Sequence, residues 1–353
     1  MSPVTTDPAR NYQEFVPFRE EQLALLRTFF AGGDCDPHSA IGPGAENAIR
    51  LERSRDLIAK TWGLNRDHII FVADRYLAFH LAISGAIAGG DHRVITYSPI
   101  EKKEILANIA GLDPRIERRE ARVAIDGAIT LPDTGSSLVI HQLRNGETGV
   151  VQKTPESLDA VIDATSARPM DLRLPRGWRA VILDASSWDG PRGVYPVAIN
   201  PEFTWVNPLA TLDTVLPTFG ASYPLTVMAA VALEQYSNID HSALSAANQS
   251  IRDIASHCED VEIAGDQRGD RLSLSFLYVQ SEELQRRLFN DGYLVDSGSA
   301  CASSSLEPSH VLTRMGLLSH GNVRIRIRPS NLGDVEHFAQ VLVGHVHKMR
   351  SEL

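Results

Sequence analysis

The sequence predicts an α/β fold built around a parallel or mixed β-sheet. Short apolar runs of strand length alternate along the chain with longer segments that have the period of a helix. Polar residues such as Asp163 and Asp184 end two of these runs, and in such sheets ligands bind beyond the carboxyl ends of the strands. With 353 residues, the chain is long enough for one large domain and a smaller one.

The first half of the chain supplies most of the expected sheet. Residues 1–18 contain three prolines and no clear period, so we expect an N-terminal arm there. Apolar residues recur on one face of residues 19–31, and Gly32 ends that helix. The further helices are expected over 44–62, 77–88 and 100–110. The strands are expected over 68–72, 93–97, 138–141, 161–163 and 180–184.

From about residue 223 the expected order is helix, helix, strand, helix, strand, helix, strand, helix, with one of the strands at 293–295. The two long helices near 223–237 and 243–257 would join two domains. We therefore predict a large α/β domain over 19–237 and a smaller α+β domain over 238–353, which carries Cys301.

The composition excludes several classes of protein. Hydrophobic residues make up 43% and charged residues 22%, as in ordinary globular proteins. The net charge of −10 argues against a nucleic-acid or anionic-membrane partner. No apolar run is long enough to span a membrane, and no signal peptide is visible. Three distant cysteines suit a reducing compartment, so we expect a cytoplasmic protein; the scattered histidines predict no metal site.

The segment from Asp296 to Ser309 surrounds Cys301 with serine, glycine and alanine residues. Small neighbours give a thiol access and mobility, and reactivity depends on exposure and on the thiolate population. The plainer interpretation is a serine-rich surface loop with an incidental cysteine.

Residues 297–301 read SGSAC and residues 306–309 read LEPS. This segment resembles the sulfur-carrying loop of the NifS/IscS branch of cysteine desulfurases, and weaker similarity extends over about residues 19–350. The resemblance implies a fold-type I, class V aminotransferase fold similar to aspartate aminotransferase, pyridoxal phosphate as cofactor, and a homodimer. It also implies that Cys301 is the catalytic thiol.

Two residues correspond to the family's contacts with the cofactor ring. Residues 163–166 read DATS and resemble the family's Asp-Ala-Thr-Gln run. Asp163 would pair with the pyridine nitrogen, and Ser166 stands where the glutamine bonds the ring hydroxyl. The alternative for Asp163 is a carboxylate that only ends a strand.

The family's lysine lies in a Ser-x-His-Lys-x-x-Gly-Pro-Lys-Gly run, whose tail resembles residues 190–193. Counting back places Ser187 at the lysine and Ser186 at the histidine. A serine hydroxyl forms no imine, so we expect no internal aldimine. Lys102 aligns with the family's ring-stacking histidine; its attack on a cofactor aldehyde from the other ring face is the less favoured alternative.

At the phosphate end, residues 74–78 read DRYLA where the family has Gly-Ala-Thr-Glu-Ser. Asp74 replaces the glycine, and Arg75 is the candidate partner of an anion. The family's Arg-Ser-Gly-Thr run, contributed across the dimer interface, corresponds to residues 218–221.

The substrate side is better preserved. Residues 145–152 resemble the family's Asn-Asn-Glu-x-Gly-Val-x-Gln run, with Asn145 as the matched amide. Residues 323–325 resemble its Ile-Arg-Phe run, whose arginine clamps the substrate carboxylate, so Arg324 is the expected clamp. Arg326 and Arg328 alternate with it and should share its face of the strand. The alternative for Arg324 is a surface arginine.

These observations favour a degenerate cysteine desulfurase-like protein. It would accept a persulfide on Cys301, act as a regulatory partner of an active desulfurase, or serve another sulfur-acceptor protein. Two alternatives stay open. One is an active pyridoxal phosphate-dependent desulfurase that converts cysteine to alanine and an enzyme persulfide. The other is a non-catalytic interaction protein that uses the same fold.

Overall fold

A seven-stranded mixed sheet, the large sheet, forms the centre of the computed structural model, which describes residues 7–15, 17–31, 41–209, 220–265, 269–298 and 308–353. The strand order is β1-β9-β8-β7-β6-β2-β3. The strands from β3 to β8 pair in parallel, whereas β9 is antiparallel to both β8 and β1. The bounds are Ile69–Val72 (β1), Val94–Tyr97 (β2), Glu117–Glu120 (β3), Leu138–Gln142 (β6), Ser157–Asp163 (β7), Arg176–Ile182 (β8) and Tyr195–Ile199 (β9). The α/β class and the mixed sheet are as predicted.

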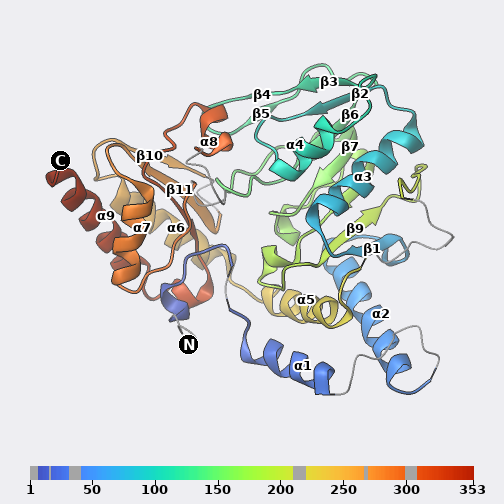
Figure 1. Ribbon diagram of the computed structural model, residues 1–353, viewed down its shortest axis with the longest axis horizontal. Helices are drawn as coiled ribbons and strands as arrows, with labels where there is room; N and C mark the ends of the chain where they lie inside the picture. The colour runs from blue at the N-terminus through green and yellow to red at the C-terminus, as the bar shows by residue number, and fades with distance from the viewer. Residues whose placement is uncertain (1–6, 16, 32–40, 210–219, 266–268, 299–307) are drawn as a thin grey trace.

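Helices cover both faces of this sheet (Figure 1). They are α2 (Gly42–Trp62), α3 (Arg75–Gly90), α4 (Lys103–Ala110) and α5 (Tyr223–Tyr236), and α1 (Glu20–Ala31) packs on the outside of α5. Strand β1 shows how the two cores divide. Ile69 and Phe71 pack with α2 and α5, whereas Ile70 and Val72 pack with α3 and α4. The side-chain period of two thus explains why a strand buried on both faces is apolar throughout.

A smaller antiparallel sheet, the small sheet, lies beside the large one. Its strands are β10 (Val261–Ala264), β11 (Arg271–Phe276) and β12 (Asn322–Arg326). The helices of this region are α6 (His241–Ala255), α7 (Ser281–Asn290), α8 (His310–Met315) and α9 (Val335–Ser351). A separate pair consists of β4 (Arg122–Val123) and β5 (Ile129–Thr130). Short 3-10 helices lie at Pro8–Arg10, Arg66–His68, Pro169–Asp171, Ala185–Trp188 and Pro329–Asn331.

The N-terminal arm packs against the small sheet. The Tyr12 amide donates to the carbonyl of Leu294, and the Tyr12 carbonyl accepts from the Arg326 amide. Its ring stacks on Phe338 of α9 with 4.0 Å between centroids. These contacts bring the residues that follow Tyr12 to the edge between the two sheets. The predicted division of the chain at 237/238 stays a prediction, although α5 packs in the core of the large sheet and α6 in that of the small one.

Two local expectations were wrong, and two strands of the large sheet, β3 and β9, were not predicted. One strand was expected between α6 and α7, and the structure has two, β10 and β11. Residues 293–295 form no strand; Leu294 makes only an isolated bridge to Asn11. The charged edge strand β3 was not predicted, because a sequence of Glu-Arg-Arg-Glu lacks the apolar signal of a buried strand. None of the helices in the described ranges is long and apolar enough to cross a membrane.

Candidate functional site

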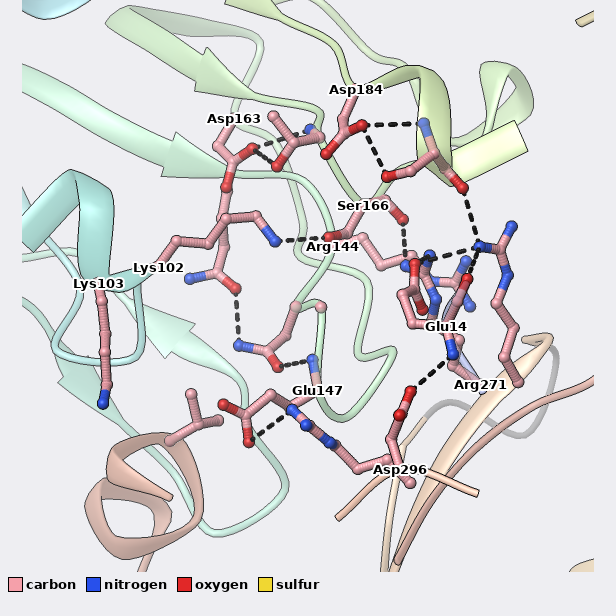
Figure 2. Close-up of a pocket in the computed structure, with 18 of the residues that line it drawn as sticks. Glu14, Lys102, Lys103, Arg144, Glu147, Asp163, Ser166, Asp184, Arg271 and Asp296 are labelled. Atoms are coloured by element: carbon pink, nitrogen blue, oxygen red, sulfur yellow. Dashed lines mark hydrogen bonds and ion pairs between the residues drawn. The ribbon is translucent and has the colours of Figure 1, made fainter. Parts of the chain in front are cut away.

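A cavity of about 490 Å³ lies beyond the carboxyl ends of β6, β7 and β8, where the small sheet approaches them. Its size suits a small ligand, and its position suits an α/β sheet. Figure 2 shows this pocket with residues of both sheets pointing into it. Six expected site residues line it: Arg75, Asn145, Asp163, Ser166, Ser186 and Arg324. Ser187 is not among its lining residues, and Cys301 lies outside the described residues.

Asp163 is the last residue of β7, and its side chain is buried. One carboxylate oxygen accepts from the Thr165 amide at 2.8 Å and from the Thr165 hydroxyl at 2.5 Å. The turn after the strand therefore fixes the orientation of the carboxylate at the pocket wall. This arrangement suits a carboxylate that holds a ligand nitrogen.

Lys102 brings an amine into the same pocket. Its Nζ donates to the Ser166 hydroxyl over 2.8 Å (Figure 2). Gly146 makes room for this contact, because a Cβ there would lie 2.8 Å from Lys102 Nζ and 2.9 Å from Ser166 Oγ. Lys102, Ser166 and Gly146 stand where the resemblance has histidine, glutamine and asparagine. Three departures from the family pattern thus meet at one point.

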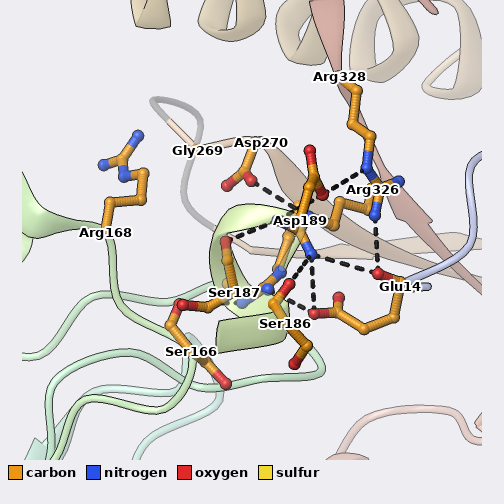
Figure 3. Close-up of polar contacts among 12 residues, drawn as sticks. Glu14, Ser166, Arg168, Ser186, Ser187, Asp189, Gly269, Asp270, Arg326 and Arg328 are labelled. Carbon is orange, nitrogen blue, oxygen red and sulfur yellow. Dashed lines mark hydrogen bonds and ion pairs between the residues drawn. The ribbon is translucent and has the colours of Figure 1, made fainter. Parts of the chain in front are cut away.

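Ser186 and Ser187 belong to the 3-10 helix that follows β8. Ser187 is buried, and its hydroxyl has no hydrogen-bond partner among the described residues. The backbone carbonyls of Ser186 and Ser187 accept from Arg326 at 3.0 and 2.7 Å (Figure 3). The cationic side chain that binds the turn of Ser186 and Ser187 is therefore Arg326, on β12 of the small sheet.

The carboxylates of Glu104 and Asp184 line the end of the pocket where α3 begins, and Asp74 is exposed beside it. Asp74 caps this helix by accepting from the Leu77 amide at 2.9 Å, so its own charge meets the helix N-terminus. Arg75 pairs with Glu104 at 2.5 Å, and its Nη1 lies 3.8 Å from Asp184. Burial raises the pKa of Asp184 above its ordinary value. An anion entering this end would meet one arginine that is already paired with two acids.

A network of arginines and acids joins the arm to both sheets. Glu14 pairs with Arg271 at 2.6 Å and with Arg326 at 3.1 Å. Asp189 accepts from Arg328 at 2.9 Å and lies 3.3 Å from Arg326 (Figure 3). Burial opposes the charge on Glu14, but Arg271 and Arg326 outweigh it and lower the pKa of the carboxyl group.

Asn145 uses its amide to shape the loop after β6. Its Nδ2 donates to the Ile100 carbonyl and to Gln142, while its Oδ1 accepts from the amides of Glu147 and Thr148. This group therefore fixes the wall of the pocket. Its predicted contact with a substrate stays a prediction.

Arg324 lies on β12 at the rim of the pocket. Its Nη2 donates to the Ser297 carbonyl at 2.7 Å, and its Nη1 lies 3.8 Å from the Glu147 carboxylate. The same Glu147 oxygen accepts from the Ser309 hydroxyl at 2.6 Å. Ser297 and Ser309, which flank the segment that contains Cys301 in the sequence, are thus each bound by a residue that lines the pocket. Arg326 lines the same pocket as Arg324, whereas Arg328 lies beyond the end of β12.

Sequence reasoning missed several groups in the pocket. Glu14 comes from the arm, which matches no motif, and Arg271 begins a strand that was not predicted separately. Glu101 is fully buried; burial and the nearby Asp163 raise the pKa of this carboxyl group well above its ordinary value. The only sequence feature that could have pointed to Glu101 was its position directly before Lys102. In the part of the chain that the structure describes, no group of three or more histidines, cysteines and acids is arranged to hold a metal ion.

No family model matches the chain. Curated relatives match it over nearly its full length. It is 25% identical over 383 residues to "Cysteine desulfurase IscS" of Dictyoglomus turgidum, covering 97% of this chain and 95% of the relative. It is 27% identical over 382 residues to "Cysteine desulfurase" of Mus musculus, covering 96% of this chain and 81% of the relative.

Solved structures show the same fold. A NifS-like protein superposes with a TM-score of 0.77 at 19% identity, covering 97% of this chain and 99% of the other. The cysteine desulfurase CsdA from Escherichia coli superposes with a TM-score of 0.75 at 14% identity, covering 99% and 97%. In sequence the chain is thus similar over nearly its full length to curated cysteine desulfurases, and it shares the fold of solved NifS-like structures.

Proposed function

We propose that this chain is a cysteine desulfurase-like protein that forms no internal aldimine and accepts sulfur on Cys301 from an active desulfurase. The observation that carries this proposal is the binding of the two described residues that flank the Cys301 segment. Arg324 binds the Ser297 carbonyl and Glu147 binds the Ser309 hydroxyl, and both Arg324 and Glu147 line the pocket. Cys301 lies between Ser297 and Ser309 in the sequence.

Two parts of the pocket do not fit a covalently bound pyridoxal phosphate. The position expected for the lysine is Ser187, whose buried hydroxyl cannot form an imine. The end expected for the phosphate holds the carboxylate of Asp184, and Arg75 is paired there with Glu104. Asp74 caps the helix that begins beside this end. Asp163 keeps the character of a cofactor contact.

The proposed step is a transfer of neutral sulfur. The Cys301 thiolate attacks the outer sulfur of a persulfide on the active desulfurase, the donor's sulfur–sulfur bond breaks, and the donor cysteine leaves as a thiolate. Cys301 then carries the persulfide, and no external oxidant or reductant is consumed. We expect the acceptor to be a homodimer, as the family resemblance implies.

The test combines the full-length chain with an active desulfurase and cysteine, and maps persulfides by mass spectrometry after alkylation. We expect the extra sulfur on Cys301, and none after Cys301→Ala. Cys258→Ala is the matched control, because Cys258 is buried and burial raises the pKa of its thiol. Failure to find sulfur on Cys301, while the donor carries its own persulfide, would exclude the acceptor role.

A further inference from the structure

The amine of Lys102 lies in the pocket and contacts Ser166 beside Gly146. Each of these three residues differs from the family pattern. Lys102 Nζ reaches Ser166 Oγ at 2.8 Å, and the missing side chain of Gly146 leaves the space that both atoms need. The pocket therefore holds an amine at Lys102, away from the position that the family resemblance gives for the lysine.

The partner of this amine is a neutral hydroxyl. No carboxylate of the described residues lies within ion-pair distance of Lys102 Nζ, although Glu101, Glu104 and Asp184 are near enough to interact with its charge. Lys103 is its exposed neighbour, and in Figure 2 its side chain lies apart from the pair formed by Lys102 and Ser166.

The opposite rim offers a partner for a carboxylate. Arg324 lines the same cavity, and its side chain is 18% exposed. Its Nη1 lies 3.8 Å from the Glu147 carboxylate. The carboxylates of Glu104 and Asp184, which line the other end, disfavour a phosphate there. With an arginine at one rim and acids at the other end, the cavity thus favours a small ligand that has a carboxylate and no phosphate.

We infer that the pocket binds a small 2-oxo acid, which Lys102 holds as an imine while Arg324 holds its carboxylate. The neutral Nζ attacks the carbonyl carbon, the carbonyl oxygen takes up the protons, and water leaves as the carbon–nitrogen double bond forms. One amine and one ketone give one imine and one water, with no change of oxidation state. This inference rests on the proposed function, because it requires a pocket without an attached cofactor.

The test traps this imine by reduction. Full-length protein is incubated with pyruvate and cyanoborohydride, digested, and mapped by mass spectrometry. We expect the label on Lys102 in clear excess over Lys103, and none at position 102 in Lys102→Arg. Acetone, a ketone of similar size without a carboxylate, should label Lys102 at least about tenfold less.

A second variant tests the carboxylate partner. Arg324→Gln should lower pyruvate labelling of Lys102 by about tenfold and leave acetone labelling unchanged. Equal labelling of Lys102 and Lys103 in the unaltered protein would overturn the inference without any variant. So would pyruvate labelling of Lys102 that Arg324→Gln leaves unchanged in a protein with an unaltered circular dichroism spectrum. The persulfide on Cys301 is measured separately, so failure of either proposal is recognised by itself.

Discussion

The guanidinium of Arg326 donates to the backbone carbonyl of Ser187 over 2.7 Å. The residue that stands at the expected lysine position is therefore in contact with a cation from another part of the chain. This contact has consequences for any attempt to restore the family's chemistry.

Ser187→Lys alone should not create a cofactor-binding enzyme. The new side chain enters a buried position beside Arg326, so we expect a loss of about 1–3 kcal/mol in the free energy of unfolding. With added pyridoxal phosphate, we expect no aldimine absorbance band and no borohydride-trapped peptide at position 187. A trapped peptide from this single variant would show that the phosphate end is not the obstacle.

Removing two carboxylates should make the pocket accept phosphate. Asp74→Gly frees the N-terminus of α3, and Asp184→Asn removes the acid beside Arg75. We expect the double variant to bind pyridoxal phosphate at least about tenfold more tightly than the unaltered chain, measured by calorimetry or cofactor fluorescence. Asp91→Gly is the control, because Asp91 ends the same helix and has a positive φ of 49° that glycine adopts freely. An equal gain in this control would point to net charge instead.

Glu14→Gln should destabilise the protein, because Arg271 and Arg326 would lose the carboxylate between them. We expect a loss of about 1.5–3 kcal/mol in the free energy of unfolding by urea titration. The comparison is Glu20→Gln, which removes only an exposed pair with Arg27 and should change stability by less than about 1 kcal/mol. If both variants lose a similar free energy of unfolding, the network around Glu14 stabilises the protein no more than an exposed ion pair does.

The buried Glu101 predicts a characteristic dependence of stability on pH. Burial raises the pKa of its carboxyl group in the folded protein, whereas the unfolded chain has the ordinary value of 4.5. Above that value the unfolded state releases this proton and the folded state retains it, so stability falls as the pH rises towards the folded-state pKa. The free energy of unfolding of Glu101→Gln, relative to that of the unaltered chain, should therefore increase between pH 5 and pH 8. Urea titrations of both proteins at each pH measure this difference. Glu156→Gln, at an exposed position, should not. A pH-independent difference for Glu101→Gln would contradict the assignment.

The sequence allowed five strands of the large sheet, β1, β2, β6, β7 and β8, to be predicted because their signal is local, whereas β3 and β9 were not predicted. In Ile69–Val72 four apolar residues in a row identify a strand buried on both faces. Leu294 gave a similar signal, but its partner is the arm near Asn11, which no local pattern reveals. The same limit explains Glu14, whose partner Arg271 is 257 positions away. Motif resemblance identified Lys102 and Ser166 one by one, and only the fold brings them into contact across 64 positions.

The arginines of β12 and the residues that follow it have a mechanical consequence. Asp189, on a turn of the large sheet, is bound by Arg328 and lies next to Arg326, while Glu14 joins both to the arm. Opening the cleft by rotating one sheet away from the other would strip several charges of their partners at once. The ion pairs between the small sheet, the arm and the turn after β8 therefore resist opening of the pocket by rotation of one sheet against the other.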